Sequence, residues 1–463
     1  VAKLVSSRDK AVRLAAIRAL GSLGDASCVP ALVRAATAND EAGRAAAESL
    51  AQLRGDEVGA ALARLLDSSE PGVRAVALAI IARRGERSAA PAVLRLARDR
   101  DPQVRKAAMD ALDEVTGPEH LAQLADLLVS TKDSRERAVL ARVITTVANR
   151  SDDLEGRAAP LVAILERADE DATCRLLEVL GRLGGRAALE AVRARLSARN
   201  PDVATAAVRA LHQWPDPAAA PYLLQIIKTA KNPIHRALAF RGYVNMANLV
   251  ASASGGKADE MYEQALALAK SAAEKRSVLA GLAAAHSPKA LKLVEEQLND
   301  PQVRAEAEMA LVKVAANCRQ TAPSEARAAL KKLIASTKNK AIARQATAVI
   351  AEMDKYKGFI TTWLGTGPYT EGDPFRSVYP PEKDQASVKW KVISRGVGPQ
   401  VIDLERAIGR GNNRAAYMLT HIWSPTDQDV RLELGTDDGV KVWVNGKLVH
   451  SNNAIRPVRI GQD

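Results

Sequence analysis

The chain has 463 residues, of which 47% are hydrophobic, so it is long enough for more than one domain and a large buried core. No uninterrupted apolar run reaches membrane-spanning length. The three cysteines, Cys28, Cys174 and Cys318, are too far apart for a disulfide framework or a zinc motif and are expected to be buried apolar side chains. The formal net charge is +12. Most of it lies on residues 1–355, which favours acidic partners but is spread too thinly to indicate nucleic acid.

Residues 1–355 repeat a helical pattern about every 31 residues. The clearest copies are 9–16, 101–108 and 300–307, in which an Asp is followed by Val, Arg and Ala at the third, fourth and seventh positions. A period of this length predicts a solenoid, because one unit cannot bury its apolar face alone. A long stacked surface of this kind favours binding over catalysis.

Each copy is predicted to form two antiparallel helices. In the first helix, Val, Ala and Leu recur at helical spacing and form one apolar stripe. Asp is expected to cap the first helix, and Pro to occupy its first position. The predicted caps are Asp9, Asp101 and Asp300, and the prolines are Pro102, Pro201 and Pro301. Glycines predicted to end first helices are Gly21, Gly24, Gly181 and Gly184, and prolines predicted to start second helices are Pro30, Pro91, Pro160 and Pro221.

The Asp-x-x-Val-Arg-x-x-Ala motif, followed by Ala-Leu-Gly-x-Leu-Gly-Asp at 19–25, resembles the short bacterial HEAT repeats that also occur in phycobilin-lyase-like proteins. The resemblance covers residues 1–355 and implies a mainly α fold, an α-α superhelical solenoid. It also implies a ladder of Asp and Arg side chains between neighbouring repeats, with Asp9/Arg13, Asp101/Arg105 and Asp300/Arg304 in those roles. Where Asn200 and Asn232 replace the acid, the ladder is expected to be weaker.

The composition changes near Lys355, where we place the boundary between a solenoid, 1–355, and a β domain, 356–463. The first part holds five aromatic residues and the second holds ten. Strands are predicted at 359–364, 388–393 and 415–423, and alternation predicts two more at 430–434 and 440–444. Asn445-Gly446 predicts a type I′ hairpin. The β domain is thus expected to be an incomplete antiparallel β-sandwich that lacks a further strand beyond Asp463.

The stretch 435–449, Gly-Thr-Asp-Asp-Gly-Val-Lys-Val-Trp-Val-Asn-Gly-Lys-Leu-Val, resembles sugar-binding jelly-roll (galactose-binding) and PA14 modules, most of all those joined to repeats in multidomain proteins of planctomycete-type bacteria. The resemblance implies a glycan as ligand, with Ca²⁺ held by Asp437 and Asp438. Two alternatives stay open, a plain Asp-Gly turn and packing of the tryptophans in the core. The other expected sugar contacts are Trp423, Trp443, Asn452 and Asn453.

Arginines occupy equivalent positions in several second helices. They are expected to form a basic row on the concave surface, where they would meet phosphates or an acidic protein; a solvated helix face is the alternative. The row consists of Arg34, Arg64, Arg95 and Arg193, and it is interrupted at Asp126, Ile164 and Gln225.

The sequence nominates no catalytic residue, since it lacks His-Glu-x-x-His, Gly-x-Ser-x-Gly and a phosphate-binding loop. We therefore expect a non-enzymatic scaffold that binds a protein partner through the repeats and makes a second contact through the β domain. The alternative is a carbohydrate-binding protein, and the third reading is an enzyme or nucleic-acid binder that uses the basic groove. No cofactor is expected apart from calcium in the glycan-binding alternative. The resemblance to exported bacterial proteins implies an extracytoplasmic location.

Overall fold

The computed structural model of the chain describes residues 1–55, 57–253, 256–319, 321–355, 359–360, 363–393, 401–422, 424, 426–459 and 461–463. Contacts divide the chain into two compact units, Val1–Leu282 and Ala283–Asp463. None of the helices in these described residues is long and apolar enough to cross a membrane.

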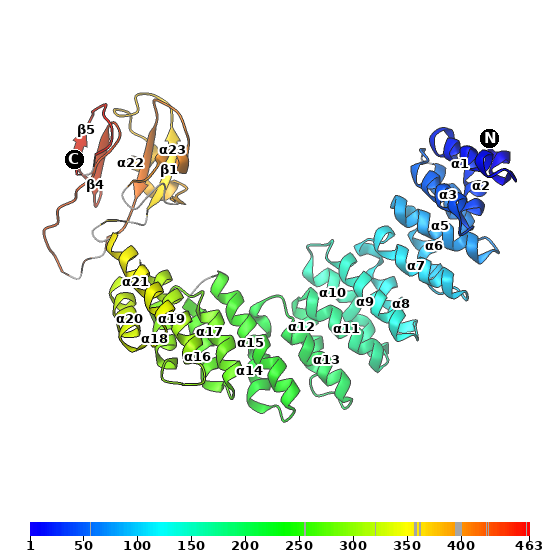
Figure 1. Cartoon of the computed structure of the whole chain (residues 1–463), viewed down its shortest axis with the longest axis horizontal. Helices are drawn as coiled ribbons and strands as arrows, with labels where there is room; N and C mark the ends of the chain where they lie inside the picture. Colours follow the sequence, from blue (N-terminus) through cyan, green and yellow to red (C-terminus); the bar gives the residue numbers. More distant parts are fainter. Residues whose placement is uncertain are drawn as a thin grey trace. The chain divides into compact units, whose positions relative to one another are not determined.

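The first unit consists of helix pairs stacked in two layers (Figure 1). Each first helix packs on the first helices before and after it, and most second helices likewise pack on a neighbouring second helix. The first-helix layer contains α1 (Lys10–Leu23), α3 (Glu41–Gln52), α5 (Pro71–Arg84), α7 (Pro102–Val115), α9 (Ser134–Ala148), α11 (Glu170–Leu183), α13 (Pro201–His212), α15 (Pro233–Ala253) and α17 (Ala272–Leu282).

The second-helix layer is joined to the first by short turns, several of which are 3-10 helices. It contains α2 (Val29–Ala36), α4 (Glu57–Leu65), α6 (Ala90–Leu96), α8 (Leu121–Ser130), α10 (Leu154–Ile164), α12 (Arg186–Ala194), α14 (Ala220–Thr229) and α16 (Gly256–Leu268). The 3-10 helices of this unit are η1 (Ala2–Ser6), η2 (Ala26–Cys28), η3 (Arg87–Ala89), η4 (Pro118–His120), η5 (Leu165–Arg167) and η6 (Pro217–Ala219).

The apolar stripe of α7 shows why the pairs stack. Val104, Ala108, Ala111 and Leu112 are all 0% exposed, because the helical period places them on one face and both neighbouring first helices cover it. A fully buried Leu or Val contributes about 1.5–3 kcal/mol relative to an exposed one. A repeat therefore depends on its neighbours for most of its stability.

The predicted N-caps at Asp9 and Asp101 are confirmed. One carboxylate oxygen of Asp101 accepts from the backbone N–H groups of Gln103 (2.9 Å) and Val104 (3.1 Å), and Pro102 is the first helical residue. The third copy differs, since Asp300 accepts from the N–H of Gln302 (2.9 Å) while Pro301 lies before the helix.

Two of the glycines predicted to end first helices lie inside them. A Cβ built on Gly181 would lie 2.6 Å from the Cα of Ala210 in α13, and one on Gly21 would lie 2.8 Å from the Cβ of Ser49 in α3. These positions bring neighbouring first helices into close contact. Gly184 has the expected positive φ, 74°, whereas Gly24 is extended.

One predicted helix start in the first unit is also wrong. Pro160 lies inside α10 and not at its start, because Asp153 caps the helix seven residues earlier and accepts from the N–H of Gly156 (3.0 Å).

The second unit begins with four more helices, which pack as consecutive neighbours, and continues into strands. The helices end at Lys355 and β1 begins at Leu364, whereas the border between the compact units falls after Leu282. The domain boundary at Lys355 stays a prediction. The helices are α18 (Pro288–Gln297), α19 (Arg304–Cys318), α20 (Pro323–Ser336) and α21 (Lys340–Lys355), followed among the strands by α22 (Pro380–Lys383), η7 (Gln385–Ser387) and α23 (Leu404–Ile408).

The strands of the second unit form two antiparallel sheets, one of order β2-β1-β3 and one of β4-β5. Asn445 (φ 51°) and Gly446 (φ 79°) make the β4–β5 turn, which confirms the predicted hairpin. The strand predicted at 430–434 is wrong, because these residues are irregular in the structure. The strands are β1 (Leu364–Tyr369), β2 (Lys391–Val392), β3 (Ala415–Leu419), β4 (Val440–Val444) and β5 (Lys447–Asn452).

Candidate interaction surface

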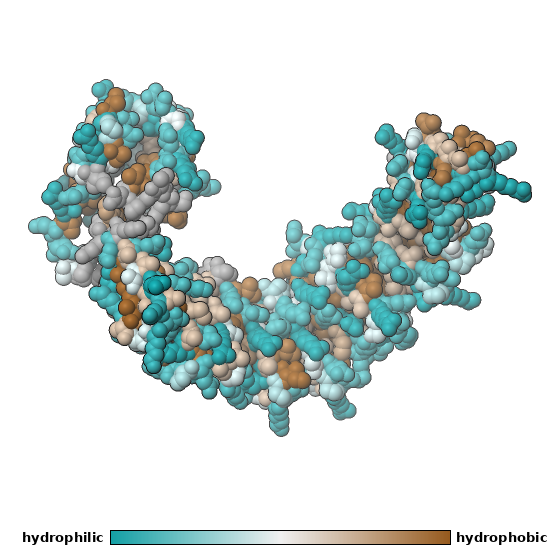
Figure 2. All heavy atoms as spheres, in the orientation of Figure 1, coloured by the Kyte–Doolittle hydropathy of each residue, from teal (hydrophilic) through white to brown (hydrophobic). Residues whose placement is uncertain are grey.

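The predicted basic row lies on the exposed side of the second-helix layer. In α2, Leu32 and Val33 are both 0% exposed and face the first helices, so the next residue, Arg34, points to solvent. Arg64 in α4 and Arg95 in α6 are exposed for the same reason. Figure 2 shows hydrophilic side chains projecting over this unit, with apolar ones set between them.

Two members of the row have acidic partners. The Arg95 guanidinium lies 2.6 Å from the Asp67 carboxylate, and the two side chains are 60% and 68% exposed. Arg193 in α12 forms an ion pair with Glu190 (2.7 Å) and lies 5.8 Å from the ring centre of Tyr222 in α14. The row is therefore not uniformly positive, and its role in binding stays a prediction.

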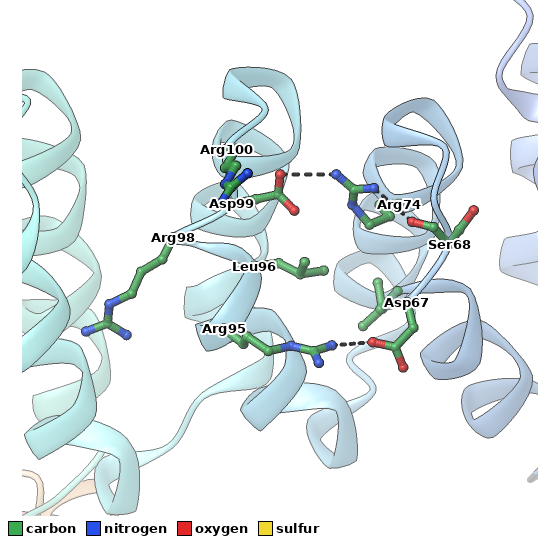
Figure 3. A pocket seen from close by; sticks show the side chains of 9 residues that line it. Asp67, Ser68, Arg74, Arg95, Leu96, Arg98, Asp99 and Arg100 are labelled. Atoms are coloured by element: carbon green, nitrogen blue, oxygen red, sulfur yellow. Dashed lines mark hydrogen bonds and ion pairs between the residues drawn. The ribbon is translucent and has the colours of Figure 1, made fainter.

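A shallow pocket with a volume of ≈ 480 Å³ lies between the ends of α4 and α6 (Figure 3). The Arg95–Asp67 pair lies at one end, and a second pair, Arg74–Asp99 (3.1 Å), lies at the other. The Arg74 and Asp99 side chains are 13% and 14% exposed, so this second pair is largely buried. The pocket is lined by Leu66, Asp67, Ser68, Arg74, Arg95, Leu96, Arg98, Asp99 and Arg100.

A second hollow, of ≈ 520 Å³, lies on the other side of α6 and shares Arg95 and Arg98 with the first. Arg98 points away from the first pocket in Figure 3 and pairs with Asp126 of α8 (2.8 Å). The two arginines therefore stand between two concave regions. The other residues that line the second hollow are Pro91, Leu94 and Gln123.

The arginines of the first helices have a different role. Arg74, Arg105 and Arg137 each donate to the carbonyl oxygen six residues earlier and also contact a carboxylate at the joint with the next repeat. The acids differ in position: Asp169 is the N-cap of α11, as the motif predicts, whereas Asp99 lies just before the cap of α7 and Glu136 lies inside α9. Arg236 of α15 pairs with Glu274 at the following joint (2.5 Å). The weakening expected at Asn200 and Asn232 stays a prediction.

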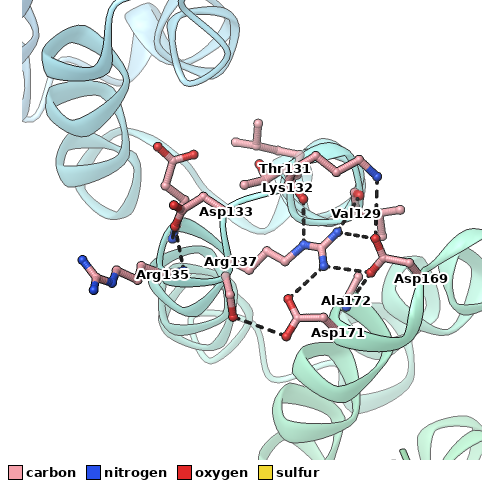
Figure 4. Close-up of polar contacts among 12 residues, drawn as sticks. Val129, Thr131, Lys132, Asp133, Arg135, Arg137, Asp169, Asp171 and Ala172 are labelled. Atoms are coloured by element: carbon pink, nitrogen blue, oxygen red, sulfur yellow. Dashed lines mark hydrogen bonds and ion pairs between the residues drawn. The ribbon is translucent and has the colours of Figure 1, made fainter. Parts of the chain in front are cut away.

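The most buried member of the ladder is Arg137, which is 2% exposed (Figure 4). It contacts both oxygens of Asp169 (2.8 and 2.7 Å) and one of Asp171 (2.8 Å), and it donates to the carbonyl of Thr131 (2.7 Å). The hydrogen bonds from the Arg137 side chain and from the Ala172 N–H lower the pKa of Asp169 from 3.8 to about 2. Arg137 of one repeat thus keeps the Asp169 carboxyl of the next repeat ionised.

This shift in pKa predicts a loss of stability in acid. Because the folded-state pKa of Asp169 lies below that of the unfolded chain, its contribution is complete above about pH 4 and is lost as the pH falls toward about 2. We expect Asp169→Asn to lower the urea midpoint of unfolding at neutral pH, and this difference from wild type to shrink near pH 2. An equal difference at both pH values would contradict the assignment.

The residues predicted to bind sugar and calcium lie around β4 and β5. Asp438 has a positive φ, 65°, as expected of an Asp-Gly turn, and its backbone N–H donates to the carbonyl of Arg456 (3.1 Å). Among the residues that the structure describes, no group of three or more His, Cys, Asp or Glu side chains could hold a metal ion. Calcium at Asp437 and Asp438 stays a prediction.

Among the predicted sugar contacts, Trp443 packs against other aromatic side chains. The ring of Trp443 lies 6.1 Å from that of Tyr417, which belongs to a cluster with Tyr369 and Tyr379. Trp423 lies outside the described residues. The amide of Asn452 donates to Asp463 (2.9 Å), whereas Asn453 is exposed beside it. The geometry at Trp443 favours the packing alternative.

The tyrosine cluster itself was not found from the sequence. Tyr417 in β3 donates to Glu382 of α22, and Tyr379 is 6% exposed. Burial, followed by the contact with Glu382, raises the pKa of Tyr417. Its members are spread over about 50 residues, from Tyr369 to Tyr417, so no local spacing indicates that they meet.

Comparison with known proteins supports the repeat assignment. The family model of HEAT repeats matches residues 1–78, 60–145 and 158–242. No curated protein matches the chain.

Several solved structures resemble the chain at low identity. An engineered protein is 20% identical with a TM-score of 0.33, and the match covers 76% of this chain and 98% of that one. Kap95p, in a structure with RanGDP, is 14% identical with a TM-score of 0.44, covering 76% and 55% of the two chains. The karyopherin Kap121p is 13% identical with a TM-score of 0.44, covering 76% and 44%. The chain spans about half the length of these last two proteins.

Proposed function

Since residues 1–145 and 158–242 of this chain carry HEAT repeats, we propose that it is a non-enzymatic protein-interaction scaffold whose partner binds the exposed side of the second-helix layer. The contrast between two sets of arginines carries this proposal. Those at the motif position of the first helices, such as Arg74 and Arg137, make contacts between repeats. Those of the second helices, such as Arg34 and Arg64, are exposed to solvent.

The exposed side of the second-helix layer also has physical properties that suit binding. An extended row of repeats offers many small contacts that add up over a long surface. Exposed ion pairs such as Arg95–Asp67 contribute only about 0–1 kcal/mol, so a partner exchanges them at little cost. Arginine is also enriched among the residues that dominate binding energy at interfaces.

Site-specific photo-crosslinking tests this proposal. A photoreactive residue placed at Arg34 or Arg64 is expected to capture a partner protein in cells that make the full chain. The matched control is the same residue at Arg142, which is exposed on α9 of the first-helix layer. Equal capture at Arg142, or capture there alone, would contradict the choice of surface.

The remaining expectations are further proposals. The β strands of the second unit would add a second contact with the partner. Glycan binding stays the alternative function. The contacts described for Asp438, Asn452 and Trp443 do not favour it. An extracytoplasmic location stays an expectation from the resemblance.

A further inference from the structure

Arg95, in the last turn of α6, and Arg98, just beyond the helix, both line the two hollows on either side of α6. Arg95 extends toward α4, where it meets Asp67, and Arg98 extends toward α8, where it meets Asp126 (Figure 3). The two cations thus mark a path that crosses α6 from one hollow to the other.

The present partners of both arginines are exchangeable. The side chains of the Arg98–Asp126 pair are 44% and 47% exposed, and those of the Arg95–Asp67 pair are more exposed still. Water and salt screen such pairs strongly. A carboxylate on a bound segment makes the same charge-assisted hydrogen bond to a guanidinium that Asp67 makes.

The surroundings of the path select the kind of ligand. Asp67, Asp99 and Asp126 alternate with the arginines, so positive charge occurs at intervals and not as a continuous stripe. A phosphate backbone, with its evenly repeated charges, would meet these carboxylates as well as the arginines. A peptide that carries acidic side chains at intervals, with small or apolar residues between them, avoids that repulsion.

We propose that the path over α6 binds an acidic, extended segment of a partner protein, with one carboxylate on Arg95 and a later one on Arg98. Exposed Pro91 contacts the segment between them, and exposed Arg100 extends the positive rim of the first pocket. The inference rests on the proposed scaffold function and assigns its partner a chemical class. Asp67 acts as an internal competitor that the segment displaces.

Fluorescence anisotropy tests the inference with the full chain and a short fluorescein-labelled peptide in which Glu alternates with Gly and Leu. The same peptide with Gln in place of Glu is the ligand control. We expect Arg95→Glu combined with Arg98→Glu to weaken binding of the Glu peptide by about tenfold or more. The combination of Arg18→Glu and Arg142→Glu changes the net charge equally, at exposed sites on α1 and α9, and is expected to have little effect.

A second variant separates specific pairing from general attraction. Asp67→Asn removes the competitor of Arg95 and is expected to tighten binding several-fold, whereas Asp110→Asn, an equal charge change at an exposed site on α7, is not. Equal effects of the two would overturn the inference, as would equal binding of the Gln peptide. Tighter binding of labelled single-stranded DNA, lost in the Arg95/Arg98 variant, would assign the path to nucleic acid instead.

The two proposals fail in different ways. If crosslinks form at Arg34 and Arg64 but the captured partner is insensitive to Arg95→Glu with Arg98→Glu, the acidic-segment inference is wrong and the scaffold stands. If the crosslinks form only on the first-helix layer, the proposed function is wrong regardless of how the peptide binds.

Discussion

We expect Arg137→Met to lower the free energy of unfolding by about 3 kcal/mol. The Arg137 side chain is 3% exposed, and its guanidinium joins α9 to the start of α11 through Asp169 and Asp171. Methionine fills part of the volume but leaves the Thr131 carbonyl and both carboxylates without this donor. The cost is at the low end for a buried pair, because the two aspartates are 48% and 43% exposed and regain water.

Urea unfolding followed by circular dichroism measures this effect, and hydrogen exchange locates it. The matched control is Arg142→Met in the same helix, where the side chain is exposed and the change is expected to stay within about 0.5 kcal/mol. Exchange should accelerate most in α9 and α11. If the two variants lose equal stability, the loss comes from replacing any arginine of α9 by methionine, and the contacts of Arg137 add nothing to the free energy of unfolding.

We expect Gly181→Val to cost about 3 kcal/mol, for the opposite reason of too much volume. A Cβ at this position lies 2.6 Å from the Cα and 2.8 Å from the Cβ of Ala210, and both residues are buried. Because the obstruction is the backbone of α13, no side-chain rotation relieves it. The helices α11 and α13 must move apart, which opens the apolar contact along their length.

The control for Gly181 is Gly72→Val near the start of α5. A Cβ there lies 3.7 Å from the Cγ2 of Thr37, an ordinary contact, and Gly72 is exposed. The thermal midpoint should fall clearly for Gly181→Val and stay close to wild type for Gly72→Val. A small effect at Gly181 would show that the two helices separate easily.

Local features of the helices were predictable from sequence, because they depend on neighbours within one turn. Asp101 caps α7 since its side chain needs only the N–H groups two and three residues ahead. The Asn445-Gly446 turn follows from the backbone preferences of two adjacent residues.

Contacts between repeats were less predictable, because the spacing that closes them varies. Arg74 meets an acid 25 residues later and Arg236 one that is 38 residues later. A fixed Asp/Arg motif therefore predicts which arginine makes the contact but does not always predict which acid it meets. The role of Gly181 could not be predicted for the same reason, because it depends on the contact with Ala210 of the next first helix and not on the sequence around Gly181.

For the candidate surface, the exposure of single arginines was predictable, but their acidic partners were not. Buried pairs such as Leu32-Val33 place the next residue outward, so the exposure of Arg34 follows from helical period. The partner of Arg95 is Asp67, 28 residues away, and pairing at that distance depends on how α4 and α6 are offset. The strand expected at 430–434 failed similarly, since alternation alone supplies no partner; Leu434 instead exchanges two backbone hydrogen bonds with Asp463 (2.9 and 3.4 Å).

The arginine ladder runs through three successive joints, from α5 to α11, and is then interrupted, because Thr173 and Ala204 stand where the arginines of α11 and α13 would be; it resumes with Arg236 and Glu274. At the next joint Gly181 meets Ala210 by van der Waals contact. We therefore expect acid to weaken the joint between α9 and α11 more than the joint between α11 and α13. The stacked first helices are thus held together by charged contacts at some joints and by apolar packing at others, so the pH of the solution determines which joint opens first.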